Sequence, residues 1–159
     1  MAYRDHLTGC YNRNFLENFF KQNTKAEGTI FFLDLDGFKN INDHLGHEAG
    51  DFILKEVSLR IDKIIQKSPL TGANFRLGGD ELVIMLIGAI PKEGIDEIAE
   101  SLISSLSLWD FHTQEFNLSV SIGIVRYKKE EQSLRELLVR ADNALYRSKV
   151  SGKNTYRYF

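Results

Sequence analysis

The sequence predicts an α+β fold in which helices pack on a central mixed sheet. Its apolar residues alternate between helical and strand-like spacing in the order helix, strand, helix, strand, strand, helix, strand, helix. Two of the strands flank a Gly-Gly-Asp-Glu turn, which indicates a tight hairpin. This order matches a split βαβ arrangement, with the hairpin turn at the rim of the sheet.

Helices are expected where apolar residues recur every three or four positions. They cover residues 13–21, 49–66, 95–106 and 134–150. Asn12 can cap the first helix with its side chain, and Gly152 is placed to stop the last. Strands are expected where apolar residues run continuously or alternate. They cover residues 30–33, 75–77, 83–87, 118–125 and 155–158, and a loop is expected over residues 42–47.

The chain has 159 residues, of which 43% are apolar, so it is long enough to bury one hydrophobic core. Residues 1–159 are therefore expected to form a single domain. Because the chain opens abruptly in turn-like residues, we expect this domain to be excised from a longer multidomain protein.

The charge composition argues against a general polyanion binder. The chain has 20 basic and 22 acidic residues and a net charge of −2, so we expect no nucleic-acid partner and no direct membrane contact. Its one cysteine, Cys10, cannot form an internal disulfide, which suits a reducing compartment. No apolar run approaches the roughly 18 residues of a membrane span. We expect a cytoplasmic domain, even if the full-length protein is anchored to a membrane.

Acidic residues follow two of the predicted strands. Asp34 ends the first strand, and Asp80 and Glu81 belong to the hairpin turn. If these strands are neighbours, Asp34 lies beside Asp80, and two converging carboxylates that repel each other suit Mg²⁺ held jointly with phosphates. Asp36 either joins this site or caps the following loop, and its position favours capping. A Gly-Gly turn with acids is, taken alone, more typical of a solvated hairpin.

Possible anion contacts lie in two places. The stretch Gly37-Phe38-Lys39 can turn backbone N–H groups toward an anion, because its glycine frees the backbone. Lys149 and Lys153 are expected one helical turn apart at the end of the last helix. Lysines there ordinarily complement the helix dipole, but beside a metal site they would also neutralise phosphate.

Asn42 and Asp51 offer an amide and a carboxylate suited to the edge of a guanine base, although each is also ordinary as a turn or first-turn residue. His44 and His47 could suggest a transition-metal cluster, but no nearby cysteine or further histidine supports one.

Other nucleotide and phosphate motifs fit poorly. Gly152-Lys153 lacks the upstream glycine of a Walker loop. An EF-hand is excluded, because the chain lacks a third acid before the glycine. The run over residues 34–37 is similar to the nucleophile motif of haloacid-dehalogenase-like phosphatases. That family has Thr or Val soon after the motif, where this chain has Phe38-Lys39. It also has a parallel core sheet, which the predicted antiparallel hairpin contradicts.

Several spaced motifs occur together along the chain. They are Asp5-His6-Leu7-Thr8-Gly9 with Asn12-Arg13, Asp34-Leu35-Asp36 with Phe38-Lys39 and Asn42-Asp43, Gly46-His47-Glu48-Ala49-Gly50-Asp51, Arg76-Leu77-Gly78-Gly79-Asp80-Glu81, Ser121-Ile122-Gly123, and Ala141-Asp142 through Gly152-Lys153-Asn154. With these motifs the chain closely resembles the GGDEF-domain diguanylate cyclases, and the resemblance extends from Asp5 to the last strand. It implies a palm-like fold related to nucleotidyl cyclases and polymerases.

The resemblance also implies a GTP substrate and two Mg²⁺ or Mn²⁺ ions per active site. The implied metal ligands are Asp34, the Leu35 carbonyl and Asp80. The implied catalytic residues are Asp80, Glu81 and Lys39, with Glu81 assisting deprotonation of the attacking hydroxyl. The implied substrate-binding residues are Gly37, Phe38, Lys39, Asn42, Asp51, Gly78, Gly79, Lys149 and Lys153.

The family reaction joins two GTP molecules into cyclic di-GMP and releases pyrophosphate. Each domain holds one GTP, and its 3′-hydroxyl attacks the α-phosphate of the GTP on the partner in line. The resemblance therefore implies a homodimer with a second GGDEF domain, and an upstream sensory or receiver domain in the full-length protein. A GTP-binding regulatory module without turnover is the alternative, and a phosphatase is the remote one.

The chain departs from the family pattern in four places. The signature ends in Leu82 instead of Phe, an exchange of apolar residues that is expected to change packing by roughly 1–2 kcal/mol and to leave the chemistry unchanged. His6 replaces the usual Pro. The inhibitory product site of the family needs Arg and Asp where this chain has Pro69 and Gly72, so we predict no such site. Some relatives that make a mixed dinucleotide carry Ser at the guanine-reading acid, and Asp51 therefore favours GTP.

Overall fold

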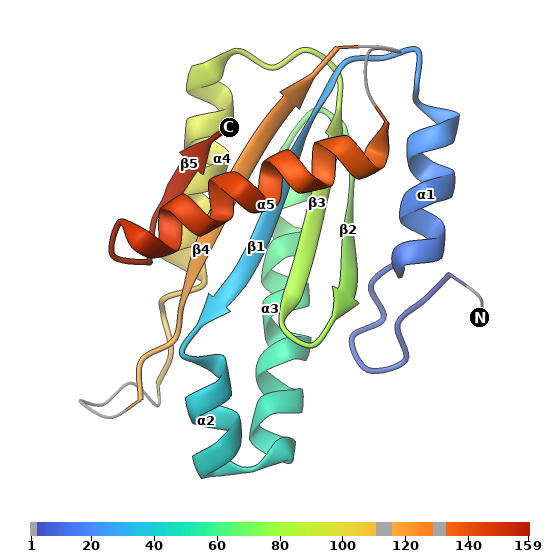
Figure 1. Ribbon diagram of the computed structural model, residues 1–159. Helices are drawn as coiled ribbons and strands as arrows, with labels where there is room; N and C mark the ends of the chain where they lie inside the picture. Colours follow the sequence, from blue (N-terminus) through green and yellow to red (C-terminus); the bar gives the residue numbers. More distant parts are fainter. Residues whose placement is uncertain (1–2, 111–115, 129–132) are drawn as a thin grey trace.

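The computed structural model describes residues 3–110, 116–128 and 133–159. These ranges contain five helices and five strands (Figure 1). In chain order they are α1 Arg13–Gln22, β1 Gly28–Asp36, α2 Phe38–Leu45, α3 His47–Lys67, β2 Thr71–Gly78, β3 Glu81–Ile87, α4 Lys92–Ser105, β4 Ser119–Tyr127, α5 Leu134–Val150 and β5 Tyr156–Tyr158. None of the helices in the described ranges is both long enough and apolar enough to cross a bilayer.

The five strands form one sheet in the order β2-β3-β1-β4-β5. Strand β1 is antiparallel to both β3 and β4, and β2 is antiparallel to β3. Strands β4 and β5 are parallel, which makes the sheet mixed. Because β3, α4 and β4 form a βαβ unit with β1 inserted between its strands, the predicted split βαβ arrangement is confirmed.

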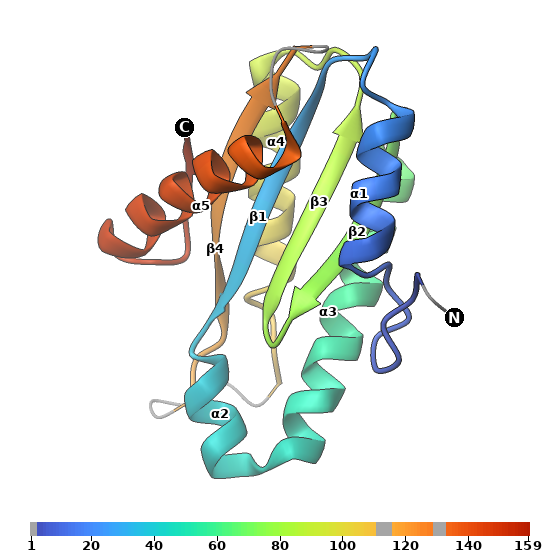
Figure 2. The same ribbon diagram turned by 45° about the vertical axis from the view of Figure 1, so that its right-hand side comes forward.

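Helices cover both faces of this sheet: α3 and α4 lie on one side, and α1 and α5 on the other (Figures 1 and 2). Side chains alternate along β1 accordingly. Phe31, Leu33 and Leu35 belong to the core under α3 and α4, whereas Ile30 and Phe32 belong to the core under α1 and α5. By the same alternation, the acids at positions 34 and 36 face the side of α5.

The predicted loop over residues 42–47 is wrong. Helix α2 covers Phe38–Leu45, and α3 begins directly after it at His47. Gly37, with φ 86°, turns the chain from β1 into α2, and Gly46, with φ 91°, separates the two helices. Only Ile41 of α2 is buried, so a short helix with one core residue leaves no apolar periodicity to detect.

The predicted position of Lys153 within the last helix is also wrong. Helix α5 ends at Val150, and the next residues form a turn that leads to β5. Gly152, Lys153 and Asn154 have φ values of 116°, 65° and 49°. Positive φ values cannot continue a right-handed helix, so Lys153 lies in the connecting turn.

Helix α5 lies directly on the backbone of β4. A Cβ atom added at Gly123 of β4 would lie 2.9 Å from Leu145 Cα and in hard contact with the Ala141 carbonyl. A glycine is therefore needed for this close approach of helix and strand.

Candidate active site

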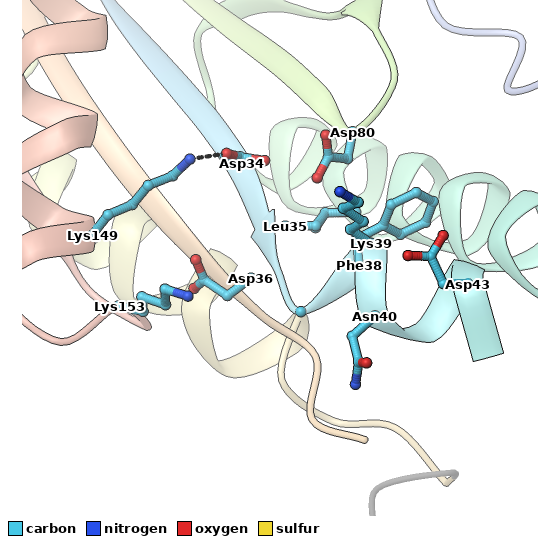
Figure 3. Close-up of a pocket in the computed structure, with 11 residues that line it drawn as sticks. Asp34, Leu35, Asp36, Phe38, Lys39, Asn40, Asp43, Asp80, Lys149 and Lys153 are labelled. Atoms are coloured by element: carbon cyan, nitrogen blue, oxygen red, sulfur yellow. Dashed lines mark hydrogen bonds and ion pairs between the residues drawn. The ribbon is translucent and has the colours of Figure 1, made fainter. Parts of the chain in front are cut away.

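A pocket of about 450 Å³ opens where β1 ends, beside the tip of the β2–β3 hairpin (Figure 3). Its walls also include the first turns of α2 and residues at and beyond the end of α5. The lining residues are Asp34, Leu35, Asp36, Gly37, Phe38, Lys39, Asn40, Asp43, Asp80, Lys149 and Lys153. Residues far apart in the sequence therefore meet at one rim of the sheet.

Asp34 and Asp80 are brought together by the sheet register. Asp34 pairs with Glu81 across β1 and β3, which places the preceding residue, Asp80, at the end of β1. Figure 3 shows the two carboxyl groups turned toward each other. Burial raises the pKa of Asp80 to about 6, and the neighbouring Asp34 carboxylate adds to this rise. The pair thus concentrates negative charge that a cation would relieve.

Lys149 supplies one positive charge to this pair. Its Nζ donates a hydrogen bond to Asp34 Oδ2. Burial opposes the charged form of Lys149, but the bond to Asp34 and the charges of Asp34, Asp36 and Asp80 outweigh that effect and raise its pKa. In this structure the lysine therefore holds the place of a counter-ion at Asp34.

The stretch after β1 fits an anion. Gly37 has a left-handed conformation, and a Cβ atom there would collide with the Asn117 carbonyl, so only glycine fits the turn. Helix α2 begins at Phe38, and its first N–H groups have no partner within the helix. Lys39, in this first turn, is exposed and lines the pocket, as Lys153 does from the other side.

Three elements of the predicted site lie outside the lining of this pocket. Glu81 is exposed and lines a separate cavity between α1 and α5. Gly78 and Gly79 form the exposed hairpin turn. Asn42 lies at the junction of α2 and α3, where the absence of a side chain at position 50 leaves room for its amide, and Asp51 is an exposed residue near the start of α3. Their roles in substrate binding stay predictions.

The histidines of this region form no metal centre in the described ranges. The Nδ1 atom of His44 lies 2.8 Å from the Asn40 carbonyl, and that of His47 lies 3.2 Å from the Asn42 amide. No cluster of three or more His, Cys, Asp or Glu side chains suited to a metal is found among the described residues. The carboxylates of Asp34 and Asp80 converge, which fits Mg²⁺ when substrate phosphates complete its oxygen ligands.

Sequence reasoning missed residues that support the site. Arg76 Nε donates to the Gly79 carbonyl at 3.0 Å, and its Nη1 binds both oxygens of Asp5 at 3.0 and 3.1 Å. This bifurcated, charge-assisted hydrogen bond ties the hairpin turn to the N-terminal segment. Both residues stood in recognised motifs, but no local pattern showed that they meet.

Comparison with known proteins bears on this arrangement. The family model described as diguanylate cyclase, GGDEF domain, matches residues 2–155. The chain belongs to the GGDEF-domain family. The predicted family membership is thereby confirmed.

Individual GGDEF proteins agree with this assignment. The bifunctional diguanylate cyclase/cyclic di-GMP phosphodiesterase MucR of Pseudomonas aeruginosa is 34% identical over all of this chain and 24% of its own length. The diguanylate cyclase DgcS of Shewanella oneidensis is 36% identical over 96% of this chain and 51% of its own length. This chain therefore spans about a quarter to a half of the length of these curated relatives.

Solved GGDEF structures share the fold. The GGDEF domain of YfiN (TpbB) from Pseudomonas aeruginosa superposes with a TM-score of 0.83 at 32% identity, over 98% of this chain and 93% of that one. The predicted α+β GGDEF fold is thus confirmed.

Proposed function

We propose that this GGDEF domain is a diguanylate cyclase that condenses two GTP molecules into cyclic di-GMP and pyrophosphate. The observation that carries this proposal is the convergence of Asp34 and Asp80 on one pocket that is also lined by Lys39, Lys149 and Lys153. Two acids with three surrounding lysines suit a metal-bound triphosphate. The names of MucR and DgcS support the same activity.

Each residue then has a role that follows from its position. Asp34, Asp80 and the Leu35 carbonyl would hold Mg²⁺ or Mn²⁺, two ions per active site, which polarise the reacting phosphate and lower the pKa of the attacking hydroxyl when bound. Lys149 and Lys153 would bind the triphosphate.

The start of α2 would complete the phosphate site. The backbone of Gly37 and Phe38 would orient the β- and γ-phosphates with Lys39, because the N–H groups and the dipole at a helix start favour anions. Asn42 of α2 and Asp51 of α3 would bind guanine. Glu81 faces the cavity between α1 and α5, so it would assist the hydroxyl only after its side chain turns toward the pocket.

The reaction requires two such domains, because each pocket would hold one GTP and each nucleotide attacks the other. We therefore propose a homodimer as the active form, acting in the cytoplasm, where GTP is available. The greater length of the curated relatives supports an upstream sensory or receiver domain that controls this pairing.

A GTP-binding module without turnover is the second candidate, favoured by the placement of Glu81 outside the pocket. The phosphatase alternative fits the structure poorly, because antiparallel strands flank β1 on both sides instead of a parallel core.

The test is to join the protein to a dimerising leucine zipper, incubate it with GTP and Mg²⁺, and look for cyclic di-GMP by chromatography. Product is expected from the wild-type sequence and none from Asp80→Ala. Tight GTP binding without product would favour the regulatory module. Activity in Asp80→Ala would refute the assignment of Asp80, and phosphate release from simple monoesters would favour the phosphatase.

A further inference from the structure

Asp36 lies at the end of β1, beside the predicted metal site, but its carboxylate is engaged by other parts of this chain. Its Oδ2 accepts hydrogen bonds from Ser119 Oγ at 2.9 Å and from the backbone N–H of Asn154 at 3.1 Å. Ser121 Oγ lies 2.7 Å from Oδ1 and 2.9 Å from Oδ2. Three donors from β4 and from the turn after α5 thus converge on one carboxylate.

These donors are held by the sheet. Asp36 pairs with Ser119 and Asp34 with Ser121 in the register of β1 and β4, so the side chains of all four project from the same face. Ser121 is fully buried. Figure 3 shows Asp34 and Asp80 turned toward each other, whereas Asp36 extends toward the side of Lys153. Asp34 therefore faces the predicted metal site, whereas Asp36 binds β4 and the turn after α5.

The turn that Asp36 holds is a strained one. Lys153 and Asn154 both have left-handed conformations, with φ values of 65° and 49°. Such a conformation is unfavourable for a residue with a side chain such as lysine and is tolerated better by asparagine. A charge-assisted hydrogen bond from the Asn154 N–H to a carboxylate offsets part of that cost. Lys153, the neighbour of Asn154, lines the pocket.

We propose that Asp36 is a positioning residue: it anchors the turn over residues 151–154 to β1 and β4, and so keeps the Lys153 ammonium at the pocket. Asp36 is assigned this role rather than that of a metal ligand, because three donors already bind its carboxylate and because it extends toward Lys153, away from the facing carboxylates of Asp34 and Asp80. The inference rests on the proposed function, because it gives Lys153 the task of binding the triphosphate.

The test compares Asp36→Ala, Asp36→Asn, Lys153→Ala and the double variant D36A/K153A by calorimetry. The probe is 3′-deoxy-GTP with Mg²⁺, because a nucleotide without a 3′-hydroxyl binds and does not react. Asp36→Ala should weaken binding about tenfold, which is the loss of one charged contact of about 1.4 kcal/mol. Guanosine monophosphate should bind equally to the wild-type protein and to Asp36→Ala, since it lacks the β- and γ-phosphates.

Two comparisons separate positioning from metal ligation. Asp36→Asn keeps an acceptor for the Asn154 N–H. Its affinity for 3′-deoxy-GTP should therefore lie within about twofold of wild type, because this hydrogen bond is retained. D36A/K153A should bind no more weakly than K153A alone, because both changes remove the same contact. The Mg²⁺ concentration for half-maximal turnover should rise in Asp34→Asn and stay unchanged in Asp36→Ala.

The inference is overturned if Asp36→Asn is as damaging as Asp36→Ala and raises the Mg²⁺ requirement, or if the effects of D36A and K153A add in full. If Asp36→Ala does not fold, Ser119→Ala removes one donor and should weaken binding about threefold. A wild-type protein that does not bind 3′-deoxy-GTP refutes the proposed function instead. Hydrogen exchange at the Asn154 amide, expected to accelerate in Asp36→Ala, then decides whether Asp36 holds the turn.

Discussion

Replacing Asp80 with Asn should stabilise the metal-free protein while it removes activity. The pKa of Asp80 lies at about 6, against an ordinary value of 3.8. A gap of about two pH units corresponds to at most about 3 kcal/mol, which solvent screening of this half-buried carboxyl reduces to about 1 kcal/mol. For a chain of this size, that gain raises the Tm by about 2–4 °C.

The sign of this effect depends on pH. Below about pH 4, Asp80 is protonated in the folded and the unfolded protein, so the charge costs nothing. The cost grows as the pH rises toward 6, because the folded protein holds the proton more tightly, and it is complete above that value. The advantage of Asp80→Asn should therefore be absent near pH 4, grow up to about pH 6 and stay constant at pH 8.

Thermal unfolding in EDTA, followed by circular dichroism from pH 4 to 8, measures this difference. Addition of Mg²⁺ with 3′-deoxy-GTP should stabilise the wild-type protein and leave Asp80→Asn almost unchanged. A variant less stable than wild type at pH 8, or an advantage equal at pH 4 and pH 8, would show that burial and the neighbouring Asp34 carboxylate do not disfavour the charged form of Asp80 as inferred.

Three further outcomes are expected. Arg76→Ala should lower the free energy of unfolding by about 2 kcal/mol, because it breaks the half-buried pair with Asp5 and frees the Gly79 carbonyl, and it should reduce turnover. Lys92→Ala is the matched control: its ion pair with Asp96 lies at the surface, so the loss of stability in the same urea titration should be much smaller, and equal losses would contradict the argument. Leu82→Phe restores the usual family residue at a fully buried position and should cost about 1–2 kcal/mol through overpacking, with the metal dependence of turnover unchanged; a shifted metal dependence would show that Leu82 affects the site. Chelation by EDTA should stop cyclic di-GMP formation and excess Mg²⁺ should restore it, whereas activity that survives EDTA would contradict the metal site.

The spacing of apolar residues was sufficient to predict the helices that bury a long apolar face. Helix α5 was predicted with the bounds it has, because its apolar residues recur through more than four turns. Helix α2 was missed, because it presents one buried residue, Ile41, among polar neighbours. Glycines at both ends of α2 resemble loop residues in the sequence, although their φ values are what begin and end the helix.

The site could be predicted where chemistry and strand ends coincide. Asp34 and Asp80 were placed together because each follows a strand that the pattern makes neighbours. The sequence did not predict the partners of Asp36, because Ser119 and Ser121 can be placed beside it only when the register of β1 and β4 is known. The turn at Lys153 was misplaced because the lysine spacing fits a helix and the left-handed residues show no pattern of their own.

The contact of α5 with the bare backbone at Gly123 bears on how such a chain can evolve. The helix has no intervening side chain to compress at this point, so any larger residue at position 123 must lift it from the sheet. Lys149 lies one helical turn beyond Leu145 and would move away from Asp34 with it. Position 123 is thus constrained by the core residues Ala141 and Leu145 and also by the position of a charge that it never touches.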